Sequence, residues 1–210
     1  AEKRTMLSFK TTFASWGEIF RDRRFVPLAI TGGLLFGQVC VFIAGAPFAL
    51  QEGFHLTPTE YTYAFAAVTI VMFSANAINR SLLKRFASVN LLRYGLSQAI
   101  FAALFMTVMN IFNIHTLSTS IIGFALSISA MGFCMANMLG LAMRDHAARA
   151  GTAAGLIGFT NSLGGAIAAP LTSLFFGLDI VGVTLFMSIL LVTAAVVGLY
   201  GIRNEKAVVH

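Results

Sequence analysis

Long apolar runs separated by short polar connections dominate the sequence from residue 25 onward. Six of these runs come near the ~20 residues that an α-helix needs to cross a bilayer. They occupy residues 25–50, 61–79, 91–112, 117–143, 151–178 and 181–202. Gly, Ala and Ser are spread through the runs without the period-two alternation of a membrane β-strand. The pattern therefore predicts an all-α integral membrane protein, a bundle of six transmembrane helices.

The composition supports this interpretation. Hydrophobic residues make up 58% of the 210 residues, charged residues only 10%, and the mean hydropathy is +0.84. A soluble domain carries about 25% charged residues, so this chain has too little polar surface to cover a soluble fold.

The basic residues are distributed unevenly between the connections. All 14 Lys and Arg lie before the first run, beside the second or fourth connection, or in the tail, and none lies in the first, third or fifth connection. Basic residues gather on the cytoplasmic side of membrane proteins, so both termini are predicted to be cytoplasmic. The net charge of +6 is then a signal of topology, and no nucleic-acid partner is expected. The chain divides into a cytoplasmic or interfacial lead-in (1–24), the bundle (25–202) and a cytoplasmic tail (203–210).

Chemistry typical of an enzyme is missing from the apolar runs. No Asp, Glu, Lys, Arg or His lies well inside a run, and the four His residues lie in connections or the tail. No His pair has the i, i+4 spacing of a metal site, so no catalytic residue, metal or cofactor is expected. Glu60 and Asp179 stand at helix ends, where carboxylates are solvated or cap a helix.

Neutral amides are the polar groups that remain inside the runs. Each needs a partner in hydrocarbon, so it must face other helices or a watery cavity. Gln98 and Asn110 are expected to hydrogen-bond neighbouring helices. Gln38 and Asn137 could do the same or could line a cavity, because Gly residues surround the first and Phe and Met residues the second. Soft Met and Phe side chains around a few amides suit varied apolar ligands.

The fifth run contains a stripe of small residues. They recur every three or four positions, which places them on one face of a helix: Gly151, Gly155, Gly158, Ser162, Gly165 or Ala166, and Ala169. Such a pattern lets two helix backbones approach closely in lipid. The stripe could pack within its own bundle or against another protein surface.

Three stretches together resemble the Bcr/CflA drug-resistance family of the major facilitator superfamily. Residues 21–66 resemble its seventh helix, with a basic RRF entry, then GAPF and QEGFHLTP. The connection NRSLLKRFASVNLLRYG (79–95) is similar to its link between helices eight and nine, and residues 136–170, around AGTAAGLIG, to helices ten and eleven. There are departures: Ala147 and Ala148 stand where the family often has Pro-His, and Asn161 replaces a frequent Gln.

The resemblance implies that these six spans are the C-terminal half of a twelve-helix transporter. The first and fourth spans would then line the central cavity, with Gln38, Phe42, Phe133 and Asn137 as substrate-binding residues. The second and fifth would face the N-terminal six-helix half, which is absent from this chain, and the small-residue stripe would meet that half. The third and sixth would face lipid. In this family, the acidic residue expected to couple protons lies in the N-terminal half of the protein.

The leading hypothesis is the C-terminal half of a proton-coupled multidrug efflux transporter of the bacterial inner membrane, exporting small apolar or amphipathic compounds by alternating access. A second is a self-contained six-helix half-transporter that dimerises. A third is a membrane scaffold or chaperone that transports nothing.

Overall fold

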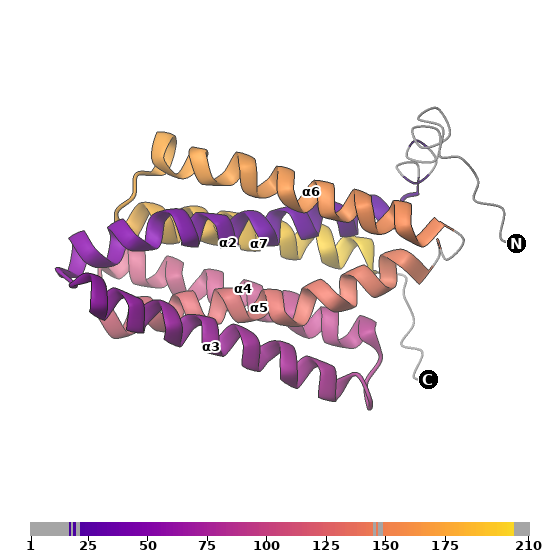
Figure 1. The fold of residues 1–210 in the computed structure, drawn as a ribbon, viewed down its shortest axis with the longest axis horizontal. Helices are drawn as coiled ribbons and strands as arrows, with labels where there is room; N and C mark the ends of the chain where they lie inside the picture. Colours follow the sequence, from indigo (N-terminus) through magenta and orange to yellow (C-terminus); the bar gives the residue numbers. More distant parts are fainter. Residues whose placement is uncertain (1–16, 18, 20–21, 145, 147–148, 204–210) are drawn as a thin grey trace, which may run out of the picture.

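Six long helices lie side by side in the computed structural model, which describes residues 17, 19, 22–144, 146 and 149–203 (Figure 1). They are α2 (Phe25–Phe54), α3 (Pro58–Leu82), α4 (Ser88–Phe112), α5 (Leu117–Arg144), α6 (Ala150–Leu171) and α7 (Ile180–Gly201), and a short π-helix, η2 (Thr172–Phe176), follows α6. All six are long and apolar enough to cross a membrane, and the described residues contain no strand. The predicted all-α bundle of six membrane helices is confirmed. Almost all of the lead-in and most of the tail lie outside the described residues.

The helices pack as two groups joined through the middle of the bundle. α2 packs mainly on α6 and α7, while α5 packs mainly on α3 and α4, and α4 also contacts α7. Figure 1 shows the result: α6 and α3 lie on opposite sides, with α2, α7, α4 and α5 between them. α3 and α6 therefore flank the molecule.

The core is filled by large apolar side chains from several helices, among them Leu35, Leu96, Phe124, Leu156 and Leu191, which are all fully buried. Because lipid tails are as apolar as these side chains, helix association in a membrane relies on close packing and on hydrogen bonds between helices.

Small residues bring α2 and α6 into the closest contact. A Cβ atom added to Gly164 of α6 would overlap the carbonyl group of Gly33 of α2, and one added to Gly33 would lie 2.8 Å from the carbonyl oxygen of Thr160. Only glycine allows the two backbones to approach this closely.

The amides of α4 find the expected partners. The Gln98 Nε2 donates to the carbonyl oxygen of Leu126 on α5 at 3.3 Å, and the Asn110 Oδ1 accepts from the hydroxyl of Thr184 on α7 at 3.0 Å. Both bonds join α4 to a neighbouring helix, which confirms the predicted role of these two amides.

Two carboxylates at helix starts also act as predicted. The Thr57 hydroxyl accepts from the backbone N–H of Glu60 at 3.3 Å, and the Glu60 carboxylate accepts from the backbone N–H of Thr57 at 2.8 Å, forming a capping box at α3. Asp179 accepts from the backbone N–H of Gly182 at 2.9 Å and caps α7. These side chains satisfy backbone donors that the first helical turn leaves free.

The fifth span ends differently from its prediction over residues 151–178. The α-helix stops at Leu171 and widens into the π-helix η2, and Gly177 then ends the segment with a φ of 74°. Pro170 explains the change, because it lacks an N–H and its ring clashes with the preceding turn. Several other helices extend a few residues beyond the apolar runs, since polar residues such as Gln51 and Glu52 continue the helix past the apolar core.

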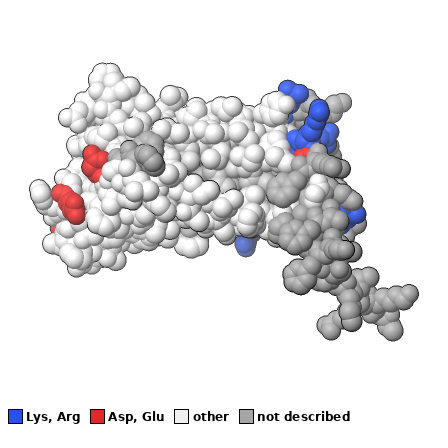
Figure 2. All heavy atoms as spheres, turned by 90° about the horizontal axis from the view of Figure 1, so that it is seen from above, with Lys and Arg blue, Asp and Glu red and all other residues white. Residues whose placement is uncertain are grey.

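Charge separates the two ends of the bundle. In Figure 2 the Lys and Arg atoms gather at one end, while acidic atoms lie at the opposite end apart from a small area among the basic ones. The first turn of α2 and the last turn of α7 lie at the same end of the bundle, where Gly201 packs against Pro27. The cytoplasmic location of the basic end stays a prediction.

Candidate functional site

Gln38 joins the two helices that were predicted to line a cavity. Its side chain is fully buried on α2, and its Nε2 donates to the Ser127 hydroxyl of α5 at 3.2 Å. The Ser127 hydroxyl in turn donates to the carbonyl oxygen of Phe124 at 2.8 Å. The Gln38 Oε1 is buried and has no hydrogen-bond partner among the described residues.

Phe42 lies one turn further along α2, in an aromatic cluster. Its ring stacks on Phe65 of α3 with centroids 5.5 Å apart and packs at a tilt on Phe124 of α5 at 5.1 Å. The ring is 3% exposed, so it fills the contact between three helices.

Asn137 makes the corresponding polar contact between α5 and α3. Its Nδ2 donates to the Oδ1 of Asn79 at 2.7 Å and to the carbonyl oxygen of Phe133 at 2.6 Å. Asn137 and Asn79 are 1% and 2% exposed, and the Asn137 Oδ1 has no hydrogen-bond partner among the described residues.

Phe133 lies one turn before Asn137 and borders a groove on the outside of the bundle. The groove has a volume of about 670 Å³ and lies between α3 and α4, with α5 as its floor. The Phe133 ring meets the Tyr94 ring edge-on, with centroids 5.0 Å apart.

The four predicted substrate-binding residues therefore fall into two groups. Gln38 and Phe42 lie where α2 meets α5, whereas Phe133 and Asn137 contact α3 and α4. None is more than 6% exposed. Each has partners inside the bundle, and the structure does not bring the four around one open cavity.

Asn161 on α6 is a polar residue that the sequence interpretation did not assign to a site. Its Nδ2 lies 3.9 Å from the sulfur of Met135 on α5, and its Oδ1 is buried without a hydrogen-bond partner among the described residues. A Cβ added to Gly32 of α2 would lie 2.6 Å from this oxygen. With Gln38 and Asn137, it gives α2, α5 and α6 one unpaired amide oxygen each. The sequence signal that could have identified Asn161 as a candidate is its amide side chain within an apolar helix.

The small-residue stripe of α6 divides between two surroundings. Gly151, Gly155 and Gly158 are exposed, and an added Cβ would meet no atom within 4 Å at any of them. Ser162 is exposed as well, and Ala169 is half-buried. Gly165, in contrast, is buried against α2 of the same bundle. A Cβ there would lie 2.6 Å from the Cys40 sulfur and 3.2 Å from the Phe36 ring.

α3 and α6 are the least buried of the six described membrane helices. Within their most apolar stretches, 17% and 22% of residues are buried, against 56% for α2, α5 and α7. The outward surface of α3 carries large side chains such as Tyr63, Ile70 and Phe73, each at least 64% exposed. The outward surface of α6 combines the small residues described above with larger side chains that are 45–51% exposed, namely Phe159, Leu163 and Ile167.

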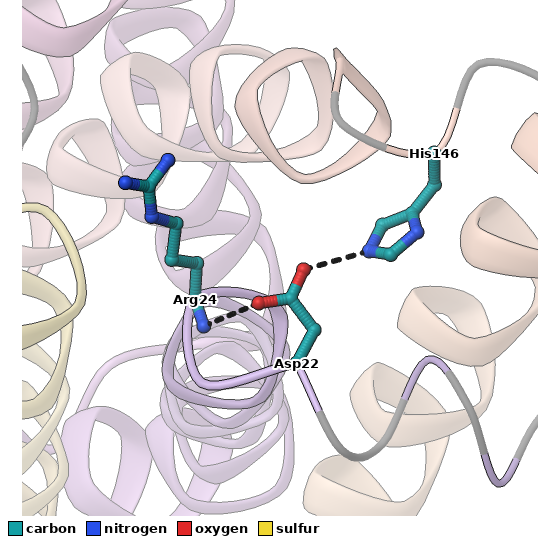
Figure 3. Close-up of polar contacts among 3 residues, drawn as sticks. All are labelled: Asp22, Arg24 and His146. Carbon is teal, nitrogen blue, oxygen red and sulfur yellow. Dashed lines mark hydrogen bonds and ion pairs between the residues drawn. The ribbon is translucent and has the colours of Figure 1, made fainter.

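A polar contact at the basic end links the connection between α5 and α6 to the start of α2 (Figure 3). The His146 Nε2 lies 2.9 Å from one carboxylate oxygen of Asp22, and the other oxygen accepts from the backbone N–H of Arg24 at 2.8 Å. The His146 ring also meets the Phe25 ring edge-on at 5.6 Å. Residues 124 positions apart are joined in this way, which the sequence spacing does not reveal.

His115 lies at the opposite end, in the connection between α4 and α5. Burial lowers the pKa of its imidazole, and the nearby Asp179 carboxylate opposes that shift. The His115 Nε2 is buried without a hydrogen-bond partner among the described residues. Among all the residues that the structure describes, no group of three or more His, Cys, Asp or Glu side chains could hold a metal ion.

Comparison with known proteins identifies the class of this helical membrane protein. Residues 2–169 match the Major Facilitator Superfamily, and the chain belongs to this family of membrane transporters. It is therefore a multi-pass membrane protein, and its family favours transport over enzymatic activity. The chain is 27% identical over 212 residues to YdgK of Bacillus subtilis (strain 168), which is described as an uncharacterized MFS-type transporter. The alignment covers 98% of this chain and 50% of that protein, so the chain spans about half the length of the curated relative.

Proposed function

We propose that this chain is the C-terminal half of a proton-coupled multidrug efflux transporter that works by alternating access. Family membership supports transport, and the relative of about twice its length supports a larger working unit. The resemblance to the Bcr/CflA family supports drug efflux and proton coupling. The bacterial relative and the positive charge at one end support a bacterial inner membrane with that end in the cytoplasm.

The observation that carries the proposal is the outward face of α6. A helix that faces lipid gains nothing from glycine at its exposed positions. A helix that contacts another helix in the membrane packs more closely when its contact residues are small. Gly151, Gly155 and Gly158 meet open space within this bundle. We assign this face, with the outward face of α3, to contact with another six-helix bundle that moves against it during transport.

The test is the substitution Gly158→Leu in the complete protein. A Cβ atom added at this exposed position meets no atom within 4 Å in the bundle, so the variant should insert and fold normally while losing export. Gly158→Ala is the matched control: it keeps the face small and should export at the wild-type rate. Export by Gly158→Leu at the wild-type rate would contradict the proposed contact.

The proposed substrates are small apolar or amphipathic compounds. Gln38 and Asn137 each keep one amide oxygen without a partner among the described residues, which supports a role as acceptors for donor groups of a substrate. Phe42 and Phe133 would supply apolar surface beside them. Since all four are buried here, their exposure requires a rearrangement of α2 and α5 during the transport cycle.

Mutagenesis separates this role from simple packing. Gln38→Leu keeps the approximate volume of the side chain and removes its hydrogen-bonding groups, so it should change the relative export rates of compounds with and without N–H donors. Equal changes for all compounds would indicate that Gln38 acts only in packing.

The length of the relative also supports the proposal over its alternatives. A self-contained half-transporter would form dimers through the α3 and α6 faces, and a scaffold would co-purify with a partner while transporting nothing. No observation specifically favours either alternative. The match to half of a longer transporter favours a chain that works as one half of a larger protein.

A further inference from the structure

The groove between α3 and α4 lies in the half of the bundle next to its basic end. Its α3 wall runs from Val71 to Leu82, where that helix ends, and its α4 wall from Tyr94 to Phe101, near the start of that helix. At 1.5 Å per residue the α3 wall is about 16 Å long. This is about half of a ~30 Å hydrocarbon core, which is the depth of one lipid leaflet.

The walls of the groove are mainly apolar and suit a hydrocarbon chain. They include Val71, Ile78 and Leu82 of α3, Phe101 of α4 and Leu126 of α5. The volume of about 670 Å³ falls within the ~300–1,000 Å³ range of small-molecule sites. Polar groups line the floor, where Gln98 is already bonded to α5.

Basic residues flank the end of the α3 wall of the groove in the sequence. Leu82 leads directly into a turn that carries Lys84 and Arg85, both exposed, and Arg80 is exposed one turn earlier on α3. The sequence contains no Asp or Glu between Glu60 and Asp145. This end of the α3–α4 pair therefore carries positive charge without an acidic residue of its own segment to neutralise it.

The outward face of α4 has the character of a lipid contact. Tyr94, Phe101, Leu104 and Ile111 are large and between 56% and 71% exposed, and this face lacks the row of exposed glycines that α6 carries. Tyr94 lies near the basic end, where an amphipathic aromatic ring suits the membrane interface. The α4 wall of the groove thus continues a surface suited to lipid.

We propose that this groove binds an anionic phospholipid of the leaflet at the basic end. One acyl chain lies between α3 and α4, and the phosphate group meets Lys84 and Arg85. Basic pockets between membrane helices bind anionic head groups by charge attraction, and each cation near the surface contributes about 1 kcal/mol, or about a five-fold change in affinity. The site is independent of the proposed transport activity.

Native mass spectrometry of the complete protein tests the proposal, with the protein taken from nanodiscs that contain equal amounts of phosphatidylglycerol and phosphatidylcholine. The wild-type protein should retain phosphatidylglycerol preferentially. The double substitution Lys84→Gln/Arg85→Gln should weaken that retention about 25-fold. The control Arg23→Gln/Arg203→Gln removes the same charge at the same end, from exposed positions just before α2 and just after α7 that do not line the groove, and should leave retention unchanged.

A second pair of variants tests the groove itself. Ser97→Trp fills it from α4 without changing charge, and should lower phosphatidylglycerol retention at least five-fold. Leu104→Trp places the same bulk on the exposed face of α4 outside the groove and should have no effect. Equal retention of the two lipids by the wild type, or equal behaviour of the two charge variants, would overturn the proposal. Full retention by Ser97→Trp would overturn the assignment of the acyl chain to the groove.

Discussion

The Asn79–Asn137 contact predicts a measurable coupling between α3 and α5. Asn137→Ala removes two hydrogen bonds, one of which spans the two helices at 2.7 Å. It leaves the Asn79 Oδ1 buried without that donor, since Asn79 is only 2% exposed. An unsatisfied buried polar group costs about 1–3 kcal/mol.

Two effects reduce that cost. Hydrogen bonds between helices in membranes average about 0.6 kcal/mol and reach about 1.7 kcal/mol, and the substitution also removes the unpaired Asn137 Oδ1 from the interior. We therefore expect Asn137→Ala to lower the free energy of unfolding by about 1 kcal/mol. The coupling energy with Asn79→Ala should be close to this value.

Reversible unfolding of the complete protein in mixed micelles supplies the assay, with both single variants and the double variant. Thr184→Ala serves as the control partner. Its hydrogen bond joins α7 to Asn110 of α4 and shares no group with the Asn79–Asn137 contact, so it should be additive with Asn137→Ala. Additivity of Asn79→Ala and Asn137→Ala within about 0.3 kcal/mol would refute the assigned contact.

Three further predictions concern packing and the helix connections. Gly164→Ala should lower the free energy of unfolding by about 1–3 kcal/mol, because its Cβ would overlap the Gly33 carbonyl; an unchanged unfolding midpoint would contradict the α2–α6 contact. Burial lowers the pKa of His115 in the folded protein, so stability should fall as the pH drops through about 6.5, the pKa of histidine in the unfolded chain. His115→Gln should flatten this part of a plot of melting temperature against pH, and equal slopes for the variant and the wild type would contradict the burial of His115. His146→Ala should cost less than about 1 kcal/mol, because the pair with Asp22 is partly exposed; a larger loss of stability in unfolding experiments would show that this contact holds the bundle together.

The sequence predicts the helices and their polar ends well, for a physical reason. A membrane span must be apolar over about 20 residues and must satisfy its own backbone groups, so composition alone locates six helices. Glu60 and Asp179 were recognisable as caps because their positions precede or open an apolar run. Gln98 needed a partner in hydrocarbon, and the structure supplies one on α5.

The candidate site could be predicted only in part. Gln38 and Asn137 were identifiable as amides in apolar helices, but their partners Ser127 and Asn79 depend on how helices distant in sequence are arranged. Periodicity alone placed Gly165 on the same face as the outward residues of α6, whereas the crossing with α2 buries it against Cys40. The groove between α3 and α4 is a property of three helices together, so no local pattern indicates it.

The central claim is that the outward face of α6 contacts another part of the working transporter, while the outward face of α4 contacts lipid. Spin labels on Gly158→Cys and Leu104→Cys, each in a cysteine-free background of the complete protein, test it through their accessibility to membrane-dissolved oxygen. We predict that the label at position 158 is shielded and the label at position 104 is accessible. Equal, high accessibility at both positions would show that α6 faces lipid and would contradict the claim.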